Sequence, residues 1–297
     1  MTAAVEACGL GKQYGRRWAL SDCTLSIPTG HVAGLVGPNG AGKTTLLNLA
    51  TGMLTPTTGT VEVLGSKPAS GPGQLAKVGY VAQDTPTYAG MSVEDHLRLG
   101  AHMNPGWDAD LASKRVQQLG LDPAQKAGKL SGGQRAQLAL TLAIAKRPEL
   151  LVLDEPIASL DPLARREFLR ILMETTAEQE LSVVMSSHLV ADLERVCDYL
   201  IVLVASRVQI DGQTEHLLAS HHLVTGQRCD AGSLPAGWQV ITESHTGRQS
   251  SFLVRTDETP RDPNWSVGQL DLEDLVLAYM GRAASTVSGS GVLEAQR

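Results

Sequence analysis

The stretch Gly37-Pro-Asn-Gly-Ala-Gly-Lys-Thr-Thr45 decides the fold, because an apolar segment precedes it and a helical pattern follows it. The apolar run His31–Val36 predicts a buried strand, and residues 43–52 predict a helix. A glycine-rich loop in this place fits G-x-x-x-x-G-K-S/T in the strand–loop–helix context that the pattern requires. Its glycines let the backbone fold around phosphate groups, and the positive end of the helix strengthens the attraction. We therefore expect a phosphate-binding loop here.

Individual positions of this loop have expected contacts. Lys43 would reach the β- and γ-phosphates of a nucleotide, and the Thr44 hydroxyl would be a ligand of Mg²⁺. Because the flanking strand and helix are both present, we set aside the alternative of a glycine-rich turn with a solvent-exposed lysine. The residues expected to bind the nucleotide are Gly37, Pro38, Asn39, Gly40, Ala41, Gly42, Lys43, Thr44 and Thr45.

A second signal is the stretch Leu150-Leu-Val-Leu-Asp-Glu-Pro156. Its four apolar residues place Asp154 at the end of a buried strand, where a carboxylate can hold the shell of Mg²⁺. Glu155 follows at once and points differently, which suits a general base that polarises an attacking water. The alternative is an Asp-Glu pair that simply lies on the surface at a strand end. Beside the phosphate loop, we expect the pair to serve nucleotide hydrolysis.

Strand and helix patterns alternate along most of the chain, which indicates an α/β domain with a mostly parallel sheet core. Residues 92–145 have a helical pattern with breaks at Asn104–Gly106 and Asp122-Pro123, so we expect a helical insertion there. Further strands are expected at Trp18–Ile27, Thr60–Leu64, Val78–Ala82 and Ser182–Ser186, and further helices at Pro162–Glu180 and His188–Cys197.

The pattern changes near residues 215–222, and the following part indicates a small α+β appendix over residues 221–283. Residues 284–297 are rich in small residues and are expected to form a disordered tail. His221 and His222 lack convincing partners, and we expect them on the surface. The elements expected in the appendix are strands at Trp238–Thr242 and Ser251–Arg255 and an amphipathic stretch at Leu270–Met280.

Composition restricts the class of protein. Of 297 residues, 42% are hydrophobic and 19% are charged, which is ordinary for a globular protein. The net charge of -6 argues against a general nucleic-acid binder, so no nucleic-acid partner is expected. The four cysteines lack metal-ligand spacing and indicate a reduced, cytosolic setting. No apolar run is long enough to cross a bilayer and no signal peptide is evident, so any membrane role is expected to act through a partner.

A third motif is Leu130-Ser-Gly-Gly-Gln134, which contains no catalytic acid, base or metal ligand. Ser131 is a good N-cap, and the apolar-rich run that follows to Ala145 predicts a helix. Two glycines at the start of a helix expose backbone N–H groups, which suits an anion. In their order and approximate spacing, the three motifs resemble those of the ATP-binding cassette (ABC) ATPases.

The resemblance covers about Val5 to Gly212. It implies a P-loop NTPase fold within residues 1–220, which would be the nucleotide-binding domain. This fold has a mostly parallel sheet core, an N-terminal antiparallel β subdomain and a helical subdomain, here over about residues 84–145. The family binds ATP with Mg²⁺ and hydrolyses it.

The resemblance also implies roles for single residues. Gln83 matches the glutamine that contacts Mg²⁺ and water, and His188 matches the histidine that contacts the γ-phosphate. Tyr14 matches the aromatic residue that stacks on adenine, with nearby Trp18 as its competitor. Asp161 matches the residue that couples the two active sites. The expected sets are Glu155, His188, Gln83 and Lys43 for catalysis, and Thr44, Gln83 and Asp154 for Mg²⁺.

In this family the signature motif of one domain closes over the ATP that another domain holds. Ser131, Gly132, Gly133 and Gln134 would then contact the γ-phosphate on a partner's phosphate loop. The alternative is that Ser131 is only a helix cap and the glycines only a turn. The resemblance therefore predicts a dimer around two ATP, either with a second copy of this chain or with a different ABC ATPase.

The family resemblance favours the ATPase subunit of a membrane transporter, bound to a separate permease at the cytoplasmic face of the membrane. The alternative is a soluble ABC ATPase of DNA repair or translation, but such proteins usually carry coiled-coil insertions or tandem cassettes. The segments Ser186–Asp198 and Leu272–Met280 resemble bacterial ABC-2 exporter ATPases, which often export drugs or antibiotics. We therefore expect export, with import as the alternative.

Overall fold

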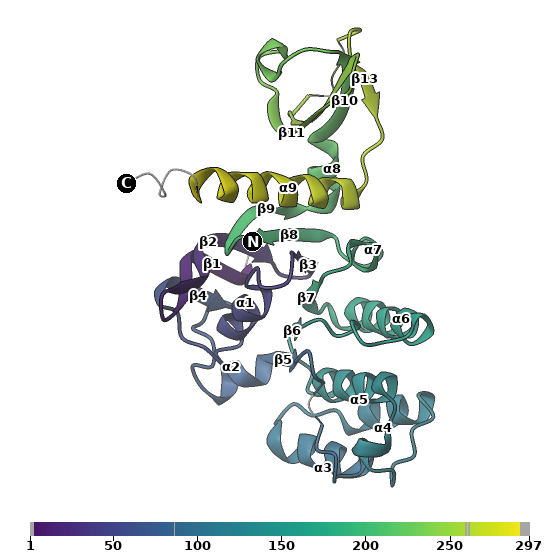
Figure 1. Ribbon diagram of the computed structural model, residues 1–297. Coiled ribbons are helices and arrows are strands. Elements are labelled where there is room, and N and C mark those ends of the chain that lie inside the picture. Colours follow the sequence, from purple (N-terminus) through teal and green to yellow (C-terminus); the bar gives the residue numbers. More distant parts are fainter. Residues whose placement is uncertain (1–2, 86, 259, 261, 292–297) are drawn as a thin grey trace.

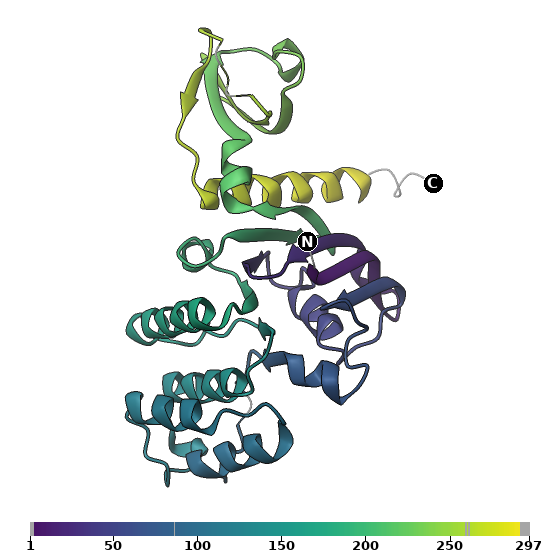
Figure 2. The same ribbon diagram turned by 180° about the vertical axis from the view of Figure 1, so that it is seen from behind.

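The computed structural model describes residues 3–85, 87–258, 260 and 262–291, with the backbone alone for residues 284–291. Two sheets and their helices make up the larger part of the molecule. A third sheet, of four strands, lies beyond the long C-terminal helix (Figures 1 and 2).

A six-stranded sheet forms the centre of the larger part, in the order β5-β6-β7-β3-β8-β9. Its first five strands are parallel, and β9 pairs with β8 in the antiparallel direction at one edge. This arrangement confirms the expected α/β core. The strands are β3 (Val32–Val36), β5 (Val78–Val81), β6 (Leu150–Leu153), β7 (Ser182–Ser187), β8 (Tyr199–Val204) and β9 (Arg207–Gln213).

Side chains of the central strands alternate between two apolar clusters, one on each face of the sheet. Along β6, Leu151 and Leu153 belong to the cluster that includes α5 and α6, whereas Leu150 and Val152 belong to the cluster that includes α1. Because both faces are covered, such strands are continuous apolar runs, which makes them easy to recognise in the sequence. The helices are α1 (Lys43–Ala50), α5 (Gly132–Ala145) and α6 (Pro162–Gln179).

An antiparallel sheet in the order β2-β1-β4 packs against α1 and confirms the expected N-terminal β subdomain. The sequence did not reveal β1, because its register shifts between Ala7 and Leu10 and the shift breaks the two-residue alternation. The strands are β1 (Ala3–Tyr14), β2 (Arg17–Pro28) and β4 (Thr58–Val63).

The helical insertion follows β5 and has a small apolar core of its own, to which Val93, Val116 and Leu138 belong. Helix α5 contacts α3 and α4 within the insertion and also contacts β5 and α6. The insertion is therefore joined to the central sheet through the helix that follows Leu130–Gln134. The other helices of this region are α3 (Val93–Met103), α4 (Ala109–Gln118) and the 3-10 helix η1 (Ala127–Lys129), and α2 (Pro72–Lys77) precedes β5.

The helix expected over His188–Cys197 is wrong over most of its length. Only Val190–Leu193 is helical (α7), because Leu189 is extended and its N–H donates to the Ser187 hydroxyl. At the other end, the Leu193 carbonyl accepts from the N–H groups of both Val196 and Cys197, which closes a turn. The chain then returns directly to β8.

The appendix contains a four-stranded antiparallel sheet in the order β11-β12-β10-β13. Helix α9 (Leu272–Gly291) lies between this sheet and the larger part of the molecule (Figure 1), and it contacts α7, β8 and β9 as well as β11. Within the described residues, neither α9 nor any other helix is long and apolar enough to cross a membrane. The other elements are α8 (Thr214–Ala219), β10 (His221–Gln227), η2 (Ala231–Ser233), β11 (Gln239–His245), β12 (Gln249–Arg255) and β13 (Ser266–Gly268).

Two expectations for the appendix need correction. His221 is not on the surface: it is 1% exposed, and its ring nitrogens contact the Leu217 carbonyl at 2.7 Å and the Tyr279 hydroxyl at 2.9 Å. The tail from residue 284, which was expected to be disordered, is helical as far as Gly291. It extends α9, within which no proline removes a backbone hydrogen-bond donor. The remainder of that expectation, residues 292–297, lies outside the described residues.

Candidate nucleotide site

The loop Gly37–Thr45 connects the C-terminal end of β3 to the start of α1, as the sequence predicted. Two of its glycines, Gly37 and Gly42, are required by close backbone approaches. A Cβ at Gly37 would lie 2.0 Å from the Leu203 carbonyl oxygen. A Cβ at Gly42, whose φ is 110°, would lie 2.3 Å from the Ala19 carbonyl oxygen. The loop is therefore pressed between β8 and the N-terminal sheet, and larger residues at either position would push it out of place.

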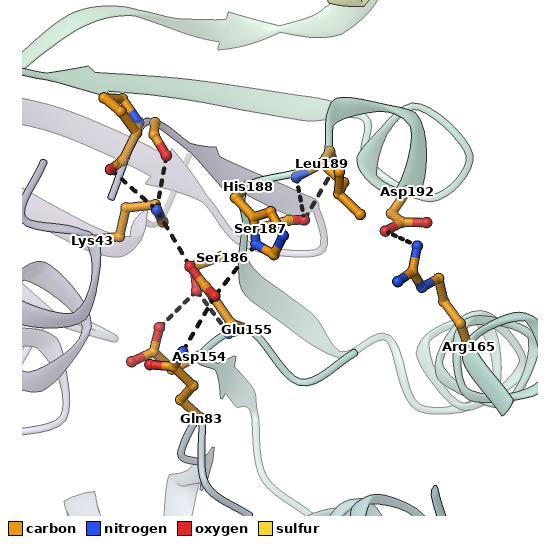
Figure 3. Close-up of polar contacts among 12 residues, drawn as sticks. Lys43, Gln83, Asp154, Glu155, Arg165, Ser186, Ser187, His188, Leu189 and Asp192 are labelled. Atoms are coloured by element: carbon orange, nitrogen blue, oxygen red, sulfur yellow. Dashed lines mark hydrogen bonds and ion pairs between the residues drawn. The ribbon is translucent and has the colours of Figure 1, made fainter. Parts of the chain in front are cut away.

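The Lys43 side chain folds back over this loop instead of extending into solvent. It is 5% exposed, and its ammonium donates to the Gly37 carbonyl at 2.8 Å. The same ammonium lies 3.3 Å from one carboxylate oxygen of Glu155 (Figure 3). A positive charge is thus held at the mouth of the loop, where the phosphates of a bound nucleotide would lie.

Glu155 is the point at which the predicted catalytic residues meet. Its second carboxylate oxygen lies 3.4 Å from His188 Nδ1 and 3.4 Å from Gln83 Nε2 (Figure 3). These residues come from the ends of different elements: Gln83 follows β5, Glu155 follows β6 and His188 follows β7. In a parallel sheet the carboxyl ends of the strands share one edge, so residues far apart in the chain come together there.

Asp154 lies beside this group and is almost completely buried, at 1% exposure. Its Oδ1 accepts a hydrogen bond of 2.7 Å from the Ser186 hydroxyl, whereas its Oδ2 has no hydrogen-bond partner among the described residues. Burial and the charge of Asp154 raise the pKa of the nearby Tyr80 to about 12. A buried carboxylate oxygen without a partner among the described residues fits an oxygen-ligated cation such as Mg²⁺.

A cavity of about 630 Å³ opens over the loop and contains most of the predicted site. Tyr14 stands at its rim and is half-exposed, with the Lys12 ammonium 5.5 Å from its ring centroid. Its competitor Trp18 does not line the cavity. Sequence reasoning missed Arg17, which enters because it is paired with Tyr14 across the β1–β2 turn. The lining residues are Tyr14, Arg17, Ala19, Asn39, Gly40, Gly42, Lys43, Thr44, Thr45, Gln83, Glu155 and His188.

The signature segment Leu130–Gln134 lies elsewhere, and its residues are absent from the described lining of this cavity. Ser131 is exposed and caps α5: its hydroxyl accepts from the Gln134 N–H at 3.2 Å, and the Gln134 side-chain oxygen accepts from the Ser131 N–H at 2.9 Å. A Cβ at Gly133 would lie 3.2 Å from the Cβ of Ala164, in the first turn of α6.

Asp161 lies on the same side as the signature segment. It caps α6 by accepting from the N–H groups of Leu163 and Ala164, both at 3.0 Å. The structure thus separates the predicted residues into two groups. One group surrounds the phosphate loop, and the other, formed by the signature segment and Asp161, sits where α5 and α6 begin.

The strand–loop–helix unit, the buried lysine and the strand-end carboxylates define a P-loop nucleotide-binding domain. The profile of a family described as "ABC transporter" matches residues 20–158. The thiamine import ATP-binding protein ThiQ of Shigella flexneri serotype 5b is 33% identical over 203 residues, which are 66% of this chain and 87% of that protein. Its counterpart in Salmonella choleraesuis is 34% identical over the same length, with 66% and 86% covered. The chain belongs to the ABC transporter family, as one of its ATP-hydrolysing subunits.

Solved structures agree with this assignment. One described as the ATP-binding subunit of an ABC transporter has a TM-score of 0.65 and 27% identity. The match covers 72% of this chain and 91% of that protein's chain. A nucleotide-free ATP-binding cassette from an ABC transporter has a TM-score of 0.63 and 25% identity, with 72% and 92% covered. The P-loop NTPase fold and the ATPase activity expected from the sequence are confirmed.

The comparisons do not support the expected ABC-2 exporter type. The curated relatives above are named as import proteins. They match about two thirds of this chain. The matched part contains the motifs of ATP hydrolysis. The similarity therefore identifies the ATPase domain, whereas the direction of transport is part of the proposed function.

Proposed function

We propose that this chain works as one half of an ATP-driven dimer that powers a separate membrane-spanning permease from the cytoplasmic face. The observation that carries the proposal is the division of the site into two groups. Lys43, Glu155 and His188 converge on the chain's own phosphate loop, whereas the exposed Ser131 and Asp161 stand apart from it. A second cassette would supply the missing contacts to each ATP.

In the proposed mechanism, the loop amides and Lys43 bind the phosphates and Tyr14 stacks on the adenine. Mg²⁺, held by Thr44, Gln83 and Asp154, would neutralise charge on the phosphates. Lys43 then exchanges its contact with Glu155 for the stronger attraction of the phosphate oxygens. This exchange frees the Glu155 carboxylate to accept a proton from the attacking water.

His188 and the partner's signature segment complete the site. The histidine contacts the γ-phosphate from the same chain. Ser131, Gly132, Gly133 and Gln134 of the second cassette donate to it from the opposite side. Asp161, at the start of α6, couples one site to the other. Because the partner contacts are strongest while the γ-phosphate is present, hydrolysis releases the dimer and drives the permease.

The variant Glu155→Gln tests this proposal. It removes the acceptor for the proton of water and also the negative charge that faces Lys43. We expect ATP turnover to fall by about 10² to 10⁴, with ATP binding retained and a stable dimer formed. Light scattering after size-exclusion chromatography with ATP measures the dimer. The double variant Glu155→Gln with Lys43→Ala is the control, and a Glu155→Gln protein that stays monomeric with bound ATP contradicts the proposal.

The direction of transport has two candidates. Import is favoured by the printed names of the curated relatives. Export is favoured by the resemblance of Ser186–Asp198 and Leu272–Met280 to ABC-2 ATPases. The purified complex with its permease, reconstituted in vesicles, distinguishes them: ATP-dependent thiamine movement toward the side of the ATPase supports import, and ATP-dependent removal of a drug from that side supports export.

A further inference from the structure

The hydroxyl of Ser186 lies between the two carboxylate residues that end β6. It donates to Asp154 Oδ1 at 2.7 Å and accepts from the Glu155 backbone N–H at 2.8 Å (Figure 3). The directions of both bonds are fixed by chemistry, because an ionised carboxylate can only accept and a backbone N–H can only donate. Ser186 is 0% exposed, so water does not compete for either bond.

The bond to Asp154 fixes the rotation of its carboxylate. With Oδ1 held by Ser186, Oδ2 is left without a partner among the described residues although it is buried. A buried oxygen without a partner is costly unless a ligand satisfies it. The Ser186 hydroxyl thus determines which oxygen of Asp154 is available to a cation.

The bond to Glu155 holds an unusual backbone conformation. Glu155 has a φ of 45°, in the left-handed region that residues other than glycine rarely adopt. Such conformations persist only where the surroundings hold them. This turn directs the Glu155 side chain away from the line of β6 and toward Lys43, Gln83 and His188. The Ser186 oxygen is the acceptor for the N–H of the turned residue.

The register of the central sheet puts the hydroxyl in this place. The last pair of the β6–β7 ladder is Leu153 with Met185, so Asp154 and Ser186 occupy the next position on the two strands. His188 follows two residues later on the same strand end. The end of β7 and the residue after it therefore present both the hydroxyl that holds the carboxylates and the imidazole that faces Glu155.

We propose that Ser186 is a positioning residue for ATP hydrolysis, which sets the orientation of Asp154 toward the cation and of Glu155 toward the attacking water. This inference rests on the function proposed above. Ser186 does not touch the nucleotide, and it acts through the two carboxylates alone.

The variant Ser186→Ala tests the proposal, with Ser182→Ala as the matched control. Ser182 is also buried on β7, and its hydroxyl likewise accepts a backbone N–H, that of Gly30, at the other end of the strand. For Ser186→Ala we expect amide hydrogen exchange at Glu155 in the nucleotide-free protein to accelerate by about tenfold, as loss of one hydrogen bond implies. The Mg²⁺ concentration for half-maximal turnover should rise and kcat should fall, each by about tenfold. Ser182→Ala should change none of these.

The outcomes separate this inference from the proposed function. Unchanged exchange at Glu155 in Ser186→Ala overturns the inference, because exchange is measured without nucleotide and does not depend on activity. Faster exchange with unchanged kcat and Mg²⁺ dependence also overturns it, since the hydroxyl would then be structural only. Ser186→Thr, which keeps the hydroxyl, should restore the wild-type exchange rate. A failure of the function itself would appear instead as turnover that survives Glu155→Gln.

Discussion

The phosphate loop and the signature segment are both glycine-containing turns that lead into helices, yet the two helices begin differently. The N-cap of α1 is Gly42, which makes no side-chain capping hydrogen bond. The N-cap of α5 is Ser131, which forms a complete capping box with Gln134. The first helix therefore leaves its N–H groups open, which suits an anion, whereas the first turn of the second helix is capped by the chain's own residues.

The two turns also differ in how far the rest of the chain encloses them. Gly37 and Gly42 are enclosed by backbone, and the buried Lys43 adds a charge. Gly132 has open space where a Cβ would be, with no described atom within 4 Å, and Ser131 is exposed. The first turn is already enclosed within the single chain, whereas under the proposed function the second contacts a nucleotide only across a dimer.

The largest expected difference concerns Lys43. Replacing it with alanine removes the buried charge from the enclosed turn, and ATP affinity should fall by about 100-fold, equivalent to about 3 kcal/mol. Isothermal titration with ATP measures the change. Lys77→Ala, which removes an exposed lysine paired with Glu149, is the control and should bind ATP normally. Undiminished ATP affinity in Lys43→Ala would contradict the phosphate role.

Matched glycine substitutions sharpen the comparison. Gly42→Ala introduces a Cβ into a left-handed residue that faces the Ala19 carbonyl, so the free energy of unfolding should fall by about 2 kcal/mol, with ATP binding impaired. Gly132→Ala meets open space in the first turn of a helix and should leave both stability and ATP binding intact. Its ATP-induced dimerisation and turnover should nevertheless decrease. Thermal melts, ATP titration and light scattering test the pair, and equal loss of ATP binding in both variants would remove the distinction.

The smallest effect is expected for Ser131→Ala. Loss of the N-cap should lower the free energy of unfolding by about 1 kcal/mol, since the Gln134 N–H loses its acceptor. The monomer should bind ATP as the wild type does, because Ser131 does not line the cavity. Turnover should fall with a steeper dependence on protein concentration, as expected if the serine acts across a dimer. Loss of ATP affinity in the isolated monomer would show that the segment acts within its own chain.

Local patterns in the sequence predicted the phosphate loop, the strand-end carboxylates and the α/β core because each depends on neighbours a few residues away. The roles of Ser186 and Arg17 could not be predicted in this way. Ser186 reaches Asp154, 32 residues earlier in the chain, because β6 and β7 are neighbours in the sheet. Arg17 enters the cavity because it pairs with Tyr14 across a turn. These relations arise only when the strands are assembled.

The errors have the same origin. His221 was expected on the surface because its partner Tyr279 lies 58 residues further along the chain. The helix expected over His188–Cys197 is shorter because the Leu189 N–H donates to the Ser187 hydroxyl at its start, and because the chain turns back toward β8 after Leu193. Helical propensity along this stretch does not reveal that a side-chain hydroxyl takes the Leu189 N–H.

Helix α9 joins the appendix to the ATPase domain through a shared apolar cluster. Leu275, Val276 and Tyr279 belong to the same apolar cluster as Leu193 of α7 and Leu200 of β8. The segment that follows His188 is thus supported from behind by the last helix of the chain. Removing α9 from this chain would therefore expose to water the apolar side chains of α7 and β8 that pack behind the residues after His188.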